Sequence, residues 1–155
     1  MKYQTTLLED SIKEFYQKLN IYTPKQLSMR EIARKLNIKL TFINISSRTY
    51  KGEIIIDSRL SPEEQWADFA HELCHVLLQY GNQIITLNSL FLEYQEWKAN
   101  NFALHFCVPT FMLLEYKINS INEGVPLIKD KFGVRKEIAE KKLDHFRNQL
   151  IQSNL

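Results

Sequence analysis

Two histidines separated by three residues stand in the segment His71-Glu72-Leu73-Cys74-His75. On a helix, positions i and i+4 lie on one face about one turn apart, so both imidazoles can reach one metal ion. Imidazole nitrogens are ligands that Zn²⁺ prefers, and a bound Zn²⁺ lowers the pKa of a water molecule toward neutrality. Glu72 is one residue along and can accept the proton of that water without binding the metal. The segment therefore predicts metal-assisted hydrolysis.

The alternative is a helix without a metal site, with one histidine in the core and the other in solvent. The sequence around the pair favours a metal site, because the remaining face of the predicted helix is apolar. Its apolar positions are Phe69, Ala70, Leu73 and Leu77. A catalytic zinc usually has three protein ligands and one open position for water, so a further ligand is expected downstream.

Four downstream side chains can supply the third ligand: Glu93, Glu96, His105 and His145. Glu96 lies far enough beyond His75 for the chain to turn and lay a second helix alongside, and Glu93 is near the same face. Asn100, one turn past Glu96, can hydrogen-bond a ligand histidine and fix its orientation. His105 is half a turn out of phase with Glu96 and should point away. We interpret His105 and His145 as structural or exposed.

The order of the predicted elements indicates an α+β fold, mostly helical with a small β-sheet, and this fold must position these side chains. Helical spacing is expected over residues 4–20, with Leu8, Ile12, Phe15 and Leu19 facing the core, and a capping box at Ser28 and Glu31 opens a short helix to about Asn37. Residues 38–57 form the predicted sheet, with β-type runs at 39–45 and 53–57 and a hairpin loop or meander connection at 46–52.

The metal-site helices are expected over about 61–107 and the C-terminal helices over about 110–152. Ser61 and Pro62 open the first metal-site helix, which should end at Gly81. A short strand at 83–88 and a helix at 89–107 follow. The last two helices, at 110–121 and 134–152, are expected to be separated by Gly124, Pro126 and Gly133.

The composition fits one compact soluble domain over residues 1–155. The hydrophobic fraction is 45% and the charged fraction 25%, which excludes a disordered or collagen-like chain. The net charge of +2 is too small to indicate nucleic acid or an anionic membrane as a partner. Apolar runs are too short for a membrane helix and the first ten residues do not resemble a signal peptide, so we expect a cytoplasmic protein with Cys74 and Cys107 as free thiols.

A second stretch makes the pattern more specific. Glu96-Trp97-Lys98-Ala99-Asn100-Asn101-Phe102-Ala103, followed by Val108-Pro109, together with the histidine pair resembles the ImmA/IrrE family of zinc metallopeptidases. The resemblance implies a zincin-like fold in a single metallopeptidase domain, with Zn²⁺ held by His71, His75 and Glu96 and with Glu72 as the catalytic carboxylate. Cys74 stands where relatives often have a small residue, and Lys98 where they often have an acid.

The resemblance also implies a function. Members of this type are often encoded by phages and mobile elements, and they cleave a helix-turn-helix repressor to relieve repression. One alternative is an anti-repressor that binds its repressor without cutting it. A less favoured alternative is a DNA-binding module, since Arg30–Ile38 looks like the first half of a helix-turn-helix. A β-type run follows that segment directly, where a recognition helix is needed.

Overall fold

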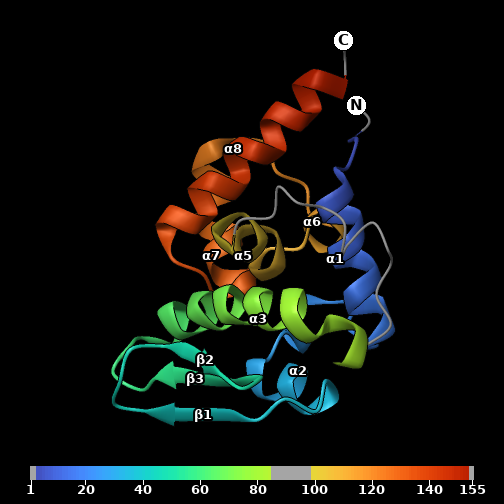
Figure 1. Ribbon diagram of the computed structural model, residues 1–155. Helices are drawn as coiled ribbons and strands as arrows, with labels where there is room; N and C mark the ends of the chain where they lie inside the picture. The colour runs from blue at the N-terminus through green and yellow to red at the C-terminus, as the bar shows by residue number, and fades with distance from the viewer. Residues whose placement is uncertain (1–2, 85–98, 154–155) are drawn as a thin grey trace.

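The structure is a computed structural model that describes residues 3–84 and 99–153. Its elements, in chain order, are α1 (Leu7–Lys18), η1 (Pro24–Gln26), α2 (Met29–Lys35), β1 (Leu40–Ile43), β2 (Arg48–Tyr50), β3 (Glu53–Asp57), α3 (Pro62–Ile84), α5 (Ala99–Cys107), α6 (Thr110–Leu113), α7 (Ile121–Phe132) and α8 (Lys136–Ser153). In Figure 1, α3 lies between the small sheet on one side and α5, α7 and α8 on the other. The predicted α+β class, with the sheet packed on the histidine-bearing helix, is confirmed.

β3 is the central strand of the sheet, with β1 at one edge and β2 at the other. β1 pairs with β3 in parallel, whereas β2 pairs with β3 antiparallel. The predicted loop over 46–52 is therefore wrong, because this segment contains β2 and crosses from one edge of the sheet to the other. The true hairpin turn is shorter. Lys51 and Gly52 have φ of 50° and 80°, which is the two-residue type I′ geometry.

α3 is the helix on which the site depends, and its beginning agrees with the sequence. The Ser61 hydroxyl accepts a bond from the Glu64 amide at 3.2 Å and donates to the Glu64 carboxylate at 2.9 Å, so the helix starts at Pro62. The predicted end at Gly81 is wrong, because α3 continues to Ile84. Gly81 is buried, and packing can outweigh the roughly 1 kcal/mol that a helical glycine costs. The predicted strand at 83–88 begins inside α3, and its remainder lies outside the described residues.

The C-terminal helices differ from the expectation in their boundaries. The predicted helix at 110–121 is shorter in the structure, where α6 ends at Leu113. Gly124 and Pro126, which were expected to separate helices, both lie inside α7. A Cβ added at Gly124 would lie 2.8 Å from Leu143 Cδ2, so glycine here permits close packing of α7 on α8. Only Gly133, with φ of 64°, ends α7 as predicted. Of the predicted helix at 89–107, the structure describes α5.

The core lies on both sides of α3. Phe69, Leu73 and Leu77 are fully buried, as their spacing predicts, and so are the aromatic rings of Phe102 and Phe106 on α5. The apolar face of α1 is buried at all four predicted positions. α3 and α5 are thus fixed against each other, which holds the polar face of α3 in place. Among the described helices, none combines the length and apolarity needed to cross a bilayer.

Candidate metal centre

His71 and His75 lie on one face of α3, one turn apart. Their Nε2 atoms are 3.3 Å from each other. Two nitrogen ligands at tetrahedral positions around Zn²⁺ are separated by about 3.4 Å when each Zn–N bond is about 2.0–2.1 Å long. The separation of the two imidazole nitrogens therefore fits a shared tetrahedral metal ion.

Asn100, on the first turn of α5, orients the first of these imidazoles. Its Oδ1 atom is 3.2 Å from His71 Nδ1, and an amide oxygen can only accept a hydrogen bond. The proton therefore sits on Nδ1 and leaves the lone pair on His71 Nε2, which faces His75. This is the tautomer that a metal ligand needs.

Glu72 is nearly buried, with 9% of its surface exposed. Burial raises the pKa of its carboxyl group, while the nearby His71 and His75 act in the opposite direction and Asp68 adds to the rise. Donor atoms of Glu72, His71 and His75 all lie within 4.8 Å of one another. A carboxyl group with a raised pKa beside two imidazoles is suited to taking up and returning a proton.

The third predicted ligand lies outside the described residues. Glu96 and the alternative Glu93 both fall in the segment 85–98, and α5 begins only at Ala99. The structure therefore brings His71, Glu72, His75 and Asn100 together, and the role of Glu96 stays a prediction.

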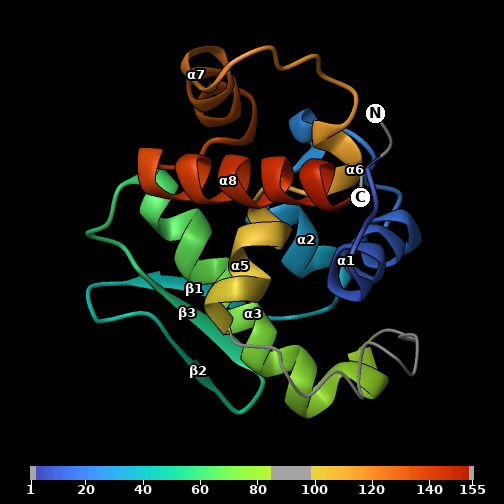
Figure 2. The ribbon, with the colours of Figure 1, turned by 90° about the horizontal axis from the view of Figure 1, so that it is seen from above.

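A cleft of about 830 Å³ opens beside these residues. One wall is α3, with His71 and Glu72, and a second is α5, with Asn100. The third wall comes from the first two turns of α8. Figure 2 shows α8 crossing over α5. The sequence contains no signal that residues from α8 belong here, because their place depends on helix packing. The cleft is large enough to receive several residues of a peptide.

Cys74 lies between the two histidines in sequence but turns into the core. It is fully buried, and burial raises the pKa of its thiol to about 12. A protonated thiol is a poor metal ligand, so Cys74 packs in the core as a free thiol, as expected from the sequence. Cys107 is also a buried free thiol.

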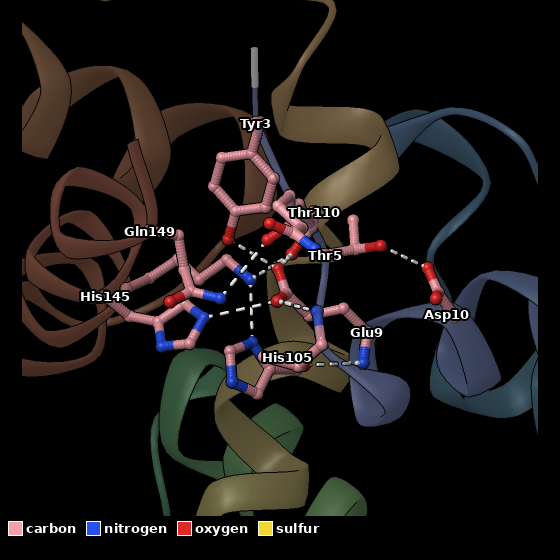
Figure 3. A network of polar contacts seen from close by, with 11 residues as sticks. Tyr3, Thr5, Glu9, Asp10, His105, Thr110, His145 and Gln149 are labelled. Carbon is pink, nitrogen blue, oxygen red and sulfur yellow. Dashed lines mark hydrogen bonds and ion pairs between the residues drawn. The ribbon is translucent and has the colours of Figure 1, made fainter. Parts of the chain in front are cut away.

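His105 and His145 belong to a second polar cluster, on the side of α5 that faces α1 and α8 (Figure 3). Their rings are 4.5 Å apart, and His145 Nε2 lies 3.3 Å from the Glu9 carboxylate. The fully buried Lys142 ammonium donates to His105 Nδ1 at 2.8 Å and to the Thr110 hydroxyl at 2.7 Å. A lysine thus supplies the cation of this cluster, and we interpret it as structural.

The second cluster predicts a loss of stability in acid. Burial, with Lys142 beside the ring, lowers the pKa of His105 to about 2. Below about pH 6.5 the unfolded chain binds a proton that the folded His105 does not. The free energy of unfolding should therefore fall as pH drops, by up to about 1.4 kcal/mol per pH unit from this residue.

Urea unfolding of the metal-free protein between pH 6.5 and 5 measures this dependence. In His105→Asn the slope against pH should be shallower by roughly that amount, because the other titrating groups are shared by both proteins. Equal slopes in the two proteins would contradict the assignment. The facing groups Glu9, Lys142 and His145 remain in the variant, so the comparison measures the loss of His105 together with the change in its coupling to them.

The contact between Asn100 and His71 gives a second prediction. Asn100→Ala should weaken Zn²⁺ binding about 10- to 100-fold, because His71 loses the acceptor that orients its ring. Competition with a chromogenic zinc chelator measures the affinity. Asn101→Ala, at the exposed neighbouring position, is the matched control and should bind Zn²⁺ like the unaltered protein. If Asn100→Ala binds Zn²⁺ with unchanged affinity, Asn100 does not orient His71 for metal binding.

Comparison with known proteins is consistent with this geometry. Residues 19–144 match the Peptidase M78 family, described as the IrrE N-terminal-like domain. The phage-like element PBSX protein XkdA of Bacillus subtilis (strain 168) is 42% identical over 147 residues, which cover 92% of this chain and 74% of XkdA. The protein YqaB of the same organism is 35% identical over 157 residues, covering 98% of this chain and 91% of YqaB. No solved structure matches the chain.

Proposed function

The chain belongs to the Peptidase M78 family, the IrrE N-terminal-like group, and from this membership we propose that it is a zinc-dependent endopeptidase. The observation that carries the proposal is the pair of His71 and His75 nitrogens at ligand spacing, with the Glu72 carboxyl group beside them and a cleft in front. We assign His71, His75 and Glu96 as zinc ligands.

In the proposed mechanism, His71, His75 and Glu96 would hold a Zn²⁺ ion, which would supply Lewis acidity toward the scissile carbonyl and the attacking water. Glu72 takes the proton from that water and then delivers it to the leaving amine. In the metal-free protein, burial raises the pKa of Glu72 and so favours the protonated form that exists between the two steps. Asn100 holds His71 in the tautomer whose Nε2 faces the metal position.

The proposed substrate is a helix-turn-helix repressor of a phage or mobile element. Two observations support this choice: the resemblance of the sequence to ImmA/IrrE peptidases, and the name of the relative XkdA, which places that protein in a phage-like element. Cleavage of such a regulator would take place in the cytoplasm. The DNA-binding alternative finds no support, since β1 follows α2 directly.

The test needs a candidate substrate, and we choose a helix-turn-helix protein encoded near this gene, if one is present there. Purified repressor is incubated with the zinc-loaded protein, and the masses of the products are measured. We expect two fragments whose masses add to the repressor plus one water. A chelator should prevent their formation and added Zn²⁺ should restore it. An intact repressor held in a stable complex would instead favour the non-cleaving anti-repressor, and absence of both would refute this partner.

A further inference from the structure

The walls of the cleft beside Glu72 differ in charge. The α3 wall carries two acids, Asp68 and Glu72. The opposite wall is formed by the beginning of α8 and the residue before it. Among the described residues, it carries the two lining bases, Arg135 and Lys141, and one acid, Glu137. In the metal-free protein the side with Asp68 and Glu72 is therefore negative, whereas the opposite side carries the lining bases; a bound Zn²⁺ would offset the negative charge of the first side.

Arg135 and Lys141 differ in how far neighbouring acids offset their charge. Arg135 is 3.6 Å from a Glu64 carboxylate oxygen and 3.4 Å from one of Glu137, so two acids offset its charge. Lys141 is exposed and forms no ion pair with another residue that the structure describes. Of the two lining bases, Lys141 is therefore the one whose charge is left for a ligand.

The cleft also has apolar side chains in its lining, on α5 and on α8. Ala103, Leu104 and Ile138 line the cleft, and Ala103 is buried while the other two are partly buried. This combination suits the side chain of Glu or Asp, whose methylene groups can contact the apolar residues while the carboxylate reaches the ammonium. A basic side chain in the same place would meet Lys141 with like charge.

On the basis of the proposed function, we infer that Lys141 determines specificity by selecting an acidic side chain close to the scissile bond of the substrate. Exposed ion pairs contribute modestly, and the expected preference for Glu over Gln is about two- to fivefold.

The test uses a pool of synthetic peptides with Glu, Gln and Lys in equal amounts at each position of an otherwise fixed sequence. The zinc-loaded protein is incubated with the pool and the cleaved peptides are sequenced by mass spectrometry. In parallel, peptides captured by Glu72→Gln are identified, so that a preference is measured without turnover. We expect enrichment of Glu at one position near the cleaved bond, loss of the enrichment in Lys141→Gln, and reversal toward Lys in Lys141→Glu.

Lys136→Glu is the matched control, because it makes the same charge change on the exposed face of α8 at a residue that does not line this cleft. It should leave the preference unchanged. Cleavage without acidic preference, or a preference that Lys141→Glu leaves intact, would overturn the inference while the peptidase proposal stands. Charge-selective capture without cleavage by the unaltered protein would refute the peptidase proposal and support the role of Lys141. Absence of both capture and cleavage would refute both.

Discussion

Glu72→Gln is expected to reduce repressor cleavage by about 10²- to 10⁴-fold, which in most assays is complete loss. Glutamine has nearly the same shape as glutamate but cannot accept the proton of the attacking water. His71 and His75 keep their places on α3, so the variant should still bind Zn²⁺. Fragment formation over time and zinc content per molecule are measured on the same preparation.

Glu63→Gln is the matched control for this change. It removes one carboxylate from the first turn of the same helix, away from the histidine pair, and should leave cleavage unchanged. Cleavage by Glu72→Gln at the normal rate would show that Glu72 is not the general base. Loss of cleavage together with loss of zinc would mean that Glu72 supports the metal rather than the proton transfer.

The parts of the site that the sequence could predict are those within one helix. The spacing of His71 and His75 fixes their common face once α3 forms, and the cap at Ser61 and Pro62 fixes where α3 begins. Asn100 is an exception, because its contact with His71 joins α5 to α3, and its helical spacing from Glu96 indicates only the face on which it lies. Local rules suffice wherever a contact depends on helical periodicity alone.

The parts that the sequence could not predict depend on how elements pack. The parallel pairing of β1 with β3 required knowing that β2 would cross to the other edge of the sheet. Gly124 resembles a helix breaker in the sequence, yet its role is to admit Leu143 of α8. The placement of Lys141 in the same cleft as the candidate metal centre has the same origin, since the packing of α8 against α5 brings it there.

The buried charges of the second cluster were also beyond sequence rules, because lysine is usually exposed. Lys142 and Glu9 lie 133 positions apart, and Glu9 accepts hydrogen bonds from Tyr3, Thr110 and its own helix cap at Thr6. His145 completes the ring around the carboxylate. The cluster thus joins α1, α5, α6 and α8, the last of which lines the cleft.

Glu9→Gln should destabilise the protein by about 3–5 kcal/mol, because it removes the buried carboxylate that contacts His145 and offsets the charge of the nearby buried Lys142. The folded protein can relieve part of this cost by releasing the proton of Lys142, whose pKa burial lowers to about 7. The loss should therefore be greater at pH 6 than at pH 8. Urea unfolding of the metal-free protein at the two pH values measures both effects.

The double variant Glu9→Gln/Lys142→Met tests whether the uncompensated charge of Lys142 causes the loss of stability in Glu9→Gln. Removing both charges eliminates the uncompensated ion, so the double variant should recover a large part of the stability lost in Glu9→Gln. Glu14→Gln is the matched control on the same helix, because Glu14 pairs with Lys18 at 3.2 Å on the surface and should cost less than about 1 kcal/mol. If Glu9→Gln costs no more than Glu14→Gln, the cluster does not hold the helices together. If it costs the larger amount while the folded variant still binds Zn²⁺ normally, the stability of the helical framework and the metal chemistry on α3 are separable properties.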